Sequence, residues 1–221
     1  MINIAIDGPA GAGKSSLSRL LAAKLGYIYV DTGALYRAVG LKFSNLGYDT
    51  NLEGDIEGVL ADTELDIRFI NSEQRVFLDG EDVSDLIRTP VASMMASAVS
   101  AKPPVRAFLL DMQRKLAENN NVVMDGRDIG TVVLPNADIK IFLTADVSVR
   151  AERRRKELEE KGQNVSFDEV LADMKQRDFN DSHRDIAPLK QADDAVLADT
   201  TELSFEESLE LLLNIAQKGS K

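Results

Sequence analysis

Nine residues near the start of the chain, GPAGAGKSS from Gly8 to Ser16, constrain the fold more than any other stretch of the 221-residue sequence. They follow an apolar run, INIAID, and lead into a helix-like segment that ends at Gly26. The loop fits the pattern G-x-x-x-x-G-K-[ST] at every constrained position. With a strand before it and a helix after it, this pattern predicts a loop that turns backbone N–H groups toward phosphate oxygens.

The residue types of the loop indicate what each position contributes. Glycines permit the tight turns, Lys14 can reach the outer phosphates of a nucleoside triphosphate, and the hydroxyl of Ser15 can bind Mg²⁺. The alternative is a flexible Gly/Ala turn in front of an ordinary helix. The strand and helix that flank the loop favour phosphate binding over that alternative.

Five short apolar runs, INIAI, YIYV, NVVM, IKIFL and AVLA, are spread along the chain. They are rich in Ile, Val or Leu without strict alternation, which is typical of strands covered on both faces. Helix-like stretches separate them, including an Arg-rich segment from Val147 to Lys161, closed by Gly162, and FEESLELLLNIAQ near the C-terminus. Strands that alternate with helices predict an α/β fold, in which a parallel five-stranded sheet carries helices on both faces.

The stretch from Leu65 to Leu78, LDIRFINSEQRVFL, departs from this alternation. It reads as two strands around a polar turn, followed by the small loop DGEDVS. This pattern predicts a small antiparallel unit inserted in the parallel fold. Because no internal repeat or low-complexity linker divides the sequence, we expect a single domain over residues 1–221.

Composition excludes several classes of partner and site. The chain has 26 basic and 37 acidic residues, and its net charge of −11 argues against nucleic acid or an anionic membrane as a partner. It has no cysteine, which excludes disulfides and thiolate metal sites. No apolar stretch approaches the roughly 20 residues of a membrane-spanning helix, so we expect a cytoplasmic protein.

The second apolar run ends in DTGALYR, at the edge of the sheet where parallel strands meet a ligand crevice. Thr32 is of a residue type that can cap the helix that follows, and Arg37 lies on the first turn of that helix, four residues after Gly33. The alternative is a simple cap and a solvated arginine. The nearby phosphate loop favours a second anionic ligand at this position.

The third run leads into MDGRDIGT. Asp125 ends the strand and is suited to hold metal-bound water, as the acidic residue of phosphate-loop enzymes does. Arg127 and Asp128 are costly to bury unless they meet a ligand or each other. A structural ion pair between them is the alternative to a ligand site.

Arginines crowd the segment VSVRAERRRKELEEKG of this acidic chain. Arg150 and Arg154 are four residues apart and share a helix face, where they can neutralise the charge of a transferring phosphoryl group. For Arg153 and Arg155 we expect salt bridges with nearby glutamates on an exposed face.

The segment MKQRDFNDSHRDIAPL predicts a helix that carries Arg177, Asp178, Asp181 and Arg184. Of these, Arg177, Asp181 and Arg184 lie at positions i, i+4 and i+7. His183 is the only histidine of the chain. Because no base-like partner lies near it in the sequence, we expect a surface or capping histidine and no catalytic role.

Together these motifs resemble the bacterial cytidylate kinases, a branch of the nucleoside monophosphate kinases. The resemblance covers nearly the whole chain: IDGPAGAGKSS, DTGALYR, LDGEDVSDLIRT, SAVSAKPPVR, MDGRDIGT, KIFLTA with its RAERR tail, and RDFNDSHRDIAPL occur in order. DGEDVS-x-x-IRT and DGRD-x-GT are more specific than the phosphate loop. The resemblance implies a P-loop NTPase-type fold with a core (1–36, 105–146 and 166–221), a monophosphate-binding insertion (about 37–104) and a helical lid (about 147–165).

The resemblance also implies transfer of the γ-phosphoryl group of ATP to CMP, and to dCMP, by a monomer. Mg²⁺ is the expected cofactor, with Ser15 as its ligand. ATP is expected on the whole loop, which comprises Gly8, Pro9, Ala10, Gly11, Ala12, Gly13, Lys14, Ser15 and Ser16. The residues implied in catalysis are Lys14, Asp125, Arg127, Arg150 and Arg154. Those implied in substrate binding are Thr32, Tyr36, Arg37, Ser97, Arg106, Arg127, Asp128, Arg177, Asp181 and Arg184. Within that set, Ser97, Arg106 and Asp128 match the family's cytosine readers.

Two other interpretations stay open at the level of the sequence. One is a phosphate-loop kinase with a different acceptor, such as AMP, UMP or a small metabolite. The DGRD turn and the large insertion argue against it. The other is a non-enzymatic nucleotide switch, which is disfavoured because the guanine-reading tetrad N-K-x-D does not occur in the chain.

Overall fold

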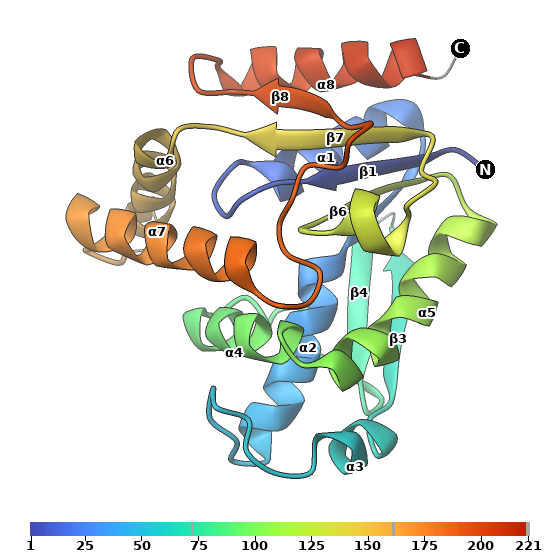
Figure 1. The fold of residues 1–221 in the computed structure, drawn as a ribbon, viewed down its shortest axis with the longest axis vertical. Helices are drawn as coiled ribbons and strands as arrows, with labels where there is room; N and C mark the ends of the chain where they lie inside the picture. The colour runs from blue at the N-terminus through green and yellow to red at the C-terminus, as the bar shows by residue number, and fades with distance from the viewer. Residues whose placement is uncertain (72, 161, 220–221) are drawn as a thin grey trace.

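The computed structural model describes residues 1–71, 73–160 and 162–219, which form one parallel and one antiparallel sheet surrounded by helices (Figure 1). The strands are β1 (Asn3–Asp7), β2 (Ile28–Asp31), β3 (Leu65–Ile70), β4 (Glu73–Leu78), β5 (Glu81–Asp82), β6 (Val122–Gly126), β7 (Ile139–Thr144) and β8 (Val196–Asp199). The α-helices are α1 (Lys14–Leu25), α2 (Thr32–Asn45), α3 (Ile56–Ala61), α4 (Pro90–Ser100), α5 (Pro103–Asn119), α6 (Val147–Glu160), α7 (Phe167–His183) and α8 (Phe205–Gly219). A short π-helix, η1 (Ile129–Val133), follows β6.

The parallel sheet has the order β2-β6-β1-β7-β8, so the five apolar runs of the sequence are its five strands. β1 lies at the centre. Its register pairs Ile6 with Asp125 and Asp7 with Gly126, which brings the carboxyl ends of β1 and β6 to the same edge. The phosphate loop and the DGRD turn leave the sheet at this edge, side by side.

Helices cover both faces of this sheet, as predicted. Ile4 and Ile6 of β1 pack into a cluster with residues of α1 and α8, whereas Ala5 packs on the other side with residues of α5 and η1. This alternation follows from the strand geometry, in which successive side chains point to opposite faces. β1 is therefore buried on both faces through its apolar centre, Ile4 to Ile6, and fixes the position of the loop that follows it.

The predicted antiparallel unit is present. β3 and β4 pair from Leu65 opposite Leu78 to Ile70 opposite Glu73, and β5 extends the sheet. Ser72, in the predicted turn, lies outside the described residues. The unit shares a hydrophobic cluster with α2, α3, α4 and α5, separate from the clusters of the parallel sheet. Figure 1 shows β3 and β4 below the parallel sheet, between α2 and α5, with α6 and α7 beyond the end toward which β7 points.

Several helix ends differ from the sequence-based expectation. Asp31 caps α2 by accepting the Ala34 N–H, and Thr32 is the first residue inside the helix, so Thr32 is not the cap. α7 ends at His183 and the backbone of Arg184 is extended, so the expected helix does not include Arg184. α1 ends at Gly26 as predicted, and α6 is described to Glu160, since the expected end at Lys161 lies outside the described residues. Among the described helices, none combines the length and apolar character needed to cross a bilayer.

Candidate active site

The phosphate loop is held tightly against the edge of the sheet. A Cβ added to Gly8 would lie 1.9 Å from the backbone oxygen of Leu143, so the close approach of the two chains requires glycine here. Gly13 adopts a left-handed conformation and α1 begins with the next residue, Lys14. The Lys14 ammonium is buried and donates across the loop to the Pro9 oxygen at 2.7 Å. Burial, together with the positive charge of Arg127, lowers the pKa of Lys14.

Asp125 joins the loop to two neighbouring strands. Its carboxylate accepts the hydroxyl protons of Ser15 at 3.0 Å and Tyr29 at 3.1 Å, while its backbone oxygen accepts the Thr32 hydroxyl at 2.7 Å. Burial and the nearby charge of Asp31 raise the pKa of Asp125. Thr32 thus serves the site by holding the end of β6.

The oxygens of Ser15 and Asp125 suit Mg²⁺, which prefers hard oxygen ligands and usually keeps phosphate oxygens and waters in its shell. In the described part of the chain, no group of three or more His, Cys, Asp or Glu side chains forms a cage for a metal. A cation at this position would thus be held by one or two protein oxygens together with its nucleotide. The donor set fits a nucleotide-bound Mg²⁺.

Two further arginines lie at this edge of the sheet, each held by a carboxylate. Arg37 of α2 donates to Asp31 at 2.8 Å, and Arg127 of the DGRD turn donates to Asp181 of α7 at 2.7 Å. Both are about three-quarters buried. The alternative Arg127–Asp128 pair is absent from the ion pairs of the described residues, because Arg127 turns to α7.

Asp128 is buried between two other arginines. Its carboxylate pairs with Arg106 at the start of α5 and with Arg184 just beyond α7, the latter at 3.3 Å. The Arg106 guanidinium lies 5.8 Å from the centre of the Tyr36 ring and also donates to the Ser100 oxygen. Burial raises the pKa of Tyr36 and lowers that of Arg184. Asp128, Arg106 and Arg184 thus form a charged group, the Asp128 trio, which lies beside the Tyr36 ring.

The two groups of charges are continuous. The charges of Arg127, Asp125 and Asp181 act on the pKa of Lys14. The charges of Asp128, Arg106 and Asp181 act on the pKa of Arg184. Asp181 belongs to both sets, so a single charged strip runs from the phosphate loop to the Asp128 trio. A protein with a net charge of −11 thereby gathers basic groups at one edge of its sheet.

The arginines of α6 divide into three kinds of environment. Arg150 is buried, donates to the Ala10 oxygen of the phosphate loop at 2.9 Å and forms a two-pronged pair with Asp178 of α7. Arg154 is more exposed and pairs with Glu157, and Arg155 pairs with Glu152 and Glu159 as expected.

The expectation for Arg153 is wrong. Arg153 donates to the Thr200 oxygen at 2.8 Å and to the Thr200 hydroxyl at 3.3 Å, and it also reaches the Leu203 oxygen. It therefore fastens α6 to the loop between β8 and α8, and it is not part of a salt-bridged exposed face.

Other predicted residues are not drawn into the charged strip by any hydrogen bond or ion pair among the described residues. Ser97 is exposed on α4, where its backbone oxygen accepts the Ser100 hydroxyl. Arg177 pairs with Asp173, one turn earlier in α7, at 3.0 Å. His183 is exposed and stacks on Phe179, which agrees with the expected surface position.

Sequence reasoning assigned no role to three residues of this region. Asp7 ends β1 and accepts two backbone N–H groups of η1, Tyr29 donates to Asp125, and Asp178 holds Arg150. Asp7 and Tyr29 lie in or at the end of apolar runs, where the sequence reads as strand. A polar residue at the carboxyl end of a parallel strand is the signal that marks Asp7.

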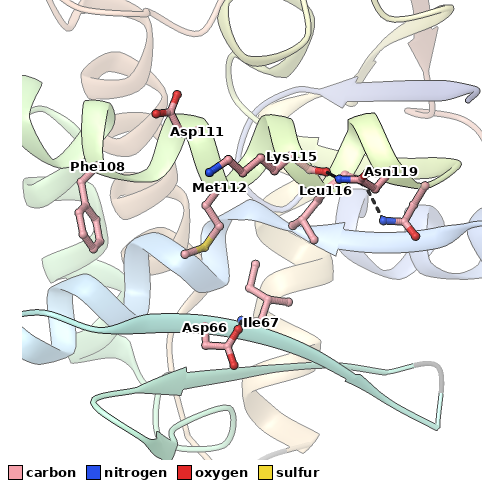
Figure 2. Close-up of a pocket in the computed structure, with 9 residues that line it drawn as sticks. Asp66, Ile67, Phe108, Asp111, Met112, Lys115, Leu116 and Asn119 are labelled. Atoms are coloured by element: carbon pink, nitrogen blue, oxygen red, sulfur yellow. Dashed lines mark hydrogen bonds between the residues drawn. The ribbon is translucent and has the colours of Figure 1, made fainter.

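A cavity of about 490 Å³ lies elsewhere, between β3 and α5. Figure 2 shows Phe108, Met112 and Leu116 pointing from α5 toward Ile67 of β3, with charged side chains at the rim. It contains none of the residues of the charged strip. The phosphate loop and the arginines therefore identify the candidate active site, and this cavity is separate from it.

Known proteins resemble this chain in sequence and in fold. The family model described as cytidylate kinase matches residues 4–218. A cytidylate kinase from Caldicellulosiruptor saccharolyticus is 52% identical over 217 residues, covering 98% of this chain and 96% of the relative. One from Thermosipho melanesiensis is 50% identical over 218 residues, covering 99% and 98%. A shikimate kinase from Bacteroides thetaiotaomicron shares the fold, with a TM-score of 0.50 and 15% identity over 98% of both chains.

Proposed function

This chain belongs to the cytidylate kinase family and is a kinase, and we propose that it transfers the γ-phosphoryl group of ATP to CMP, giving CDP and ADP. The observation that carries the proposal is the charged strip, which joins a triphosphate-binding loop at one end to the Asp128 trio at the other. Two nucleotides bound at these ends would meet phosphate to phosphate.

The donor half of the site is the phosphate loop. ATP is proposed to lie on residues 8–16, with its phosphates on the backbone N–H groups and the N-terminus of α1, and with Lys14 beside the β and γ phosphates. Ser15 would bind Mg²⁺ and Asp125 would hold a water of that ion. Mg²⁺ supplies charge neutralisation between the β and γ phosphates.

The acceptor phosphate is assigned to Arg37 and Arg127. A guanidinium has five N–H donors, so an arginine held by a carboxylate through one edge keeps others for a phosphate. Asp31 and Asp181 would thus orient these arginines before CMP arrives. Thr32 and Tyr36 would line the pocket between them.

The base is assigned to Asp128 and Arg106. Cytosine offers a 4-amino donor beside N3 and O2 acceptors, so the carboxylate can accept the amino hydrogen and the guanidinium can donate to the acceptors. Uracil presents an acceptor at position 4 and a donor at position 3, which mismatches both groups. Sites of this kind discriminate by up to roughly 10⁴–10⁵-fold. Ser97, Arg177, Asp181 and Arg184 complete the proposed CMP contacts.

The chemistry needs no protein nucleophile, because the acceptor is already an anion. A phosphate oxygen of CMP attacks the γ-phosphorus in line, and the bond from γ-phosphorus to the bridging oxygen of ADP breaks. Lys14 and Arg127 would stabilise the charge that spreads over the transferring group. Arg150 and Arg154 of α6 are proposed to close over the ATP phosphates and exclude water, which limits hydrolysis of ATP.

The division into moving parts is a further part of the proposal. Residues about 37–104 are assigned to a monophosphate-binding insertion and residues about 147–165 to a lid. The antiparallel unit packs in a hydrophobic cluster that it shares with α2 and α5, and α6 packs on α7 in another. We also propose that the enzyme accepts dCMP and acts as a cytoplasmic monomer.

One experiment tests the reaction directly. ADP formation is measured in a coupled assay with ATP, Mg²⁺ and one of CMP, dCMP, UMP or AMP. We expect rapid turnover with CMP and dCMP, slow turnover with UMP and AMP, and almost none without an acceptor. Fastest turnover with AMP or UMP would replace the proposed acceptor, and ATP hydrolysis that ignores every acceptor would point to a nucleotide switch.

A further inference from the structure

Asp7 is a buried carboxylate that the proposed reaction does not use. It is the last residue of β1 and directly precedes the phosphate loop. One of its oxygens accepts the backbone N–H of Ile129 at 2.7 Å and the other accepts that of Gly130 at 2.7 Å. Both donors belong to η1, more than 120 residues further along the chain.

These two N–H groups begin the π-helix that follows the DGRD turn. A helix start leaves backbone donors without partners, and the residue before the helix commonly caps them with its own side chain. Asp128 occupies that position, yet its side chain makes no capping bond to η1. Its carboxylate instead meets Arg106 and Arg184. Asp7 supplies the cap from β1, which leaves Asp128 free to face the base.

The ladder between β1 and β6 ends where Asp7 pairs with Gly126. Past this point the Asp7 side chain continues the connection between the two strands, because it holds the backbone just after Asp128. Gly130 packs so closely that an added Cβ would lie 3.3 Å from an Asp7 oxygen and 3.2 Å from the Lys140 side chain. The Asp7 carboxylate therefore holds the backbone just after Asp128 at a fixed place relative to the phosphate loop.

The ionised form of Asp7 is suited to accept both N–H groups, but burying its charge lowers the stability of the folded protein. Two oxygens that accept two N–H groups require a carboxylate, whereas a protonated or amide side chain offers only one full acceptor. Burial and the charge of Asp128 raise the pKa of Asp7 to about 6, against the opposing effect of its two backbone donors and Lys14. Lys140, packed against Gly130 from β7, is itself paired with Asp194.

We propose that Asp7 is a positioning residue for nucleotide selection: from the strand that carries the phosphate loop, it fixes the turn that presents Asp128 to the acceptor base. The inference rests on the proposed function for the identity of that acceptor. Asp7 touches neither substrate in this assignment and acts through Asp128.

The test compares Asp7→Asn with the wild type in full-length enzyme. The substitution keeps the shape and removes one acceptor. We expect the KM for CMP to rise roughly tenfold, as for loss of a hydrogen bond to a charged group, while the KM for ATP stays within about twofold. The preference for CMP over UMP in a competition assay should fall in parallel.

The matched control is Asp138→Asn. Asp138 also accepts a backbone N–H of β1, that of Asn3 at 2.8 Å, but at the opposite end of the strand. We expect both KM values and the selectivity of this variant to match the wild type. A merely structural role for Asp7 would instead raise the KM of ATP and CMP together or lower kcat alone, and either result would overturn the proposal.

A second variant serves if Asp7→Asn does not fold. Gly130→Ala disturbs the same contact from the other side without changing any charge, and it should raise the KM for CMP more than the KM for ATP. An unchanged ratio of the two KM values would also reject the inference. Failure of the proposed function looks different, because the wild type itself would then not phosphorylate CMP.

Discussion

Replacement of Arg106 by alanine separates base recognition from phosphoryl transfer. The guanidinium is about nine-tenths buried, pairs with Asp128 and lies near Tyr36. Its loss leaves Asp128 with Arg184 as partner at 3.3 Å. Removing one partner of a buried ion pair costs about 3–5 kcal/mol when the other charge is left alone, so the remaining pair with Arg184 should keep the loss of stability below that range.

The effect on CMP follows from the lost hydrogen bonds to the base. A hydrogen bond to a charged group contributes about 1.5–3 kcal/mol, so the KM for CMP should rise roughly 10–150-fold while the KM for ATP changes little. The preference over UMP should shrink without inverting, because Asp128 still repels the carbonyl at position 4 of uracil. Initial rates with varied CMP and a CMP/UMP competition measure both quantities. Arg19→Ala, an exposed arginine of α1, is the control, and an unchanged selectivity in Arg106→Ala would refute the base assignment.

Other perturbations test the remaining parts of the site. Lys14→Ala should lower kcat by roughly 10²–10³-fold and leave the circular dichroism spectrum intact, because it removes a cation beside the transferring group. Asp125→Asn should raise the Mg²⁺ concentration needed for half-maximal rate by roughly 10–100-fold, since it weakens the hold on Ser15 and on metal-bound water. Arg150→Ala should raise the KM for ATP and lower the melting temperature, because Asp178 loses a two-pronged partner and the phosphate loop loses its link to α6. Burial raises the pKa of Asp7 to about 6 in the folded protein, above its ordinary value of 3.8, so the folded state binds the proton more tightly and loses stability as the pH rises through 6. On lowering the pH from 7 to 5, the wild type should therefore gain about 1 kcal/mol of unfolding free energy relative to Asp7→Asn in denaturant titrations, and equal pH profiles would contradict this.

Local patterns in the sequence were sufficient to predict the strands, the antiparallel unit and the phosphate loop. Each depends on neighbours in the chain: an apolar run, a polar turn, or the spacing between Gly8 and Lys14. The end of α1 at Gly26 follows the same logic, because the helix ends in a left-handed conformation that glycine adopts without strain.

The partners of the site residues could not be predicted in the same way. Spacing along the chain leaves each arginine several possible aspartate partners, whereas the actual pairing depends on which strands and helices lie side by side. Arg127 and Asp128 are adjacent yet turn to α7 and α5, because the turn points their side chains in different directions. Thr32 is a residue type that commonly caps helices, but Asp31 caps α2 instead. Its extended backbone directs the carboxylate toward the N–H groups at the start of the helix.

The pairs also explain how an acidic chain can bind two anions. Arg37, Arg106, Arg127 and Arg150 are each held by an aspartate, so their positive charges are balanced within the protein. An arginine fixed in this way loses less conformational freedom when a phosphate or base arrives, and the ordering is completed during folding. The aspartates reduce the net attraction for nucleotides, but they place the guanidiniums where charge develops in the transition state. Because catalysis depends on the difference between transition-state and ground-state binding, weaker attraction for the bound substrates is compatible with fast transfer.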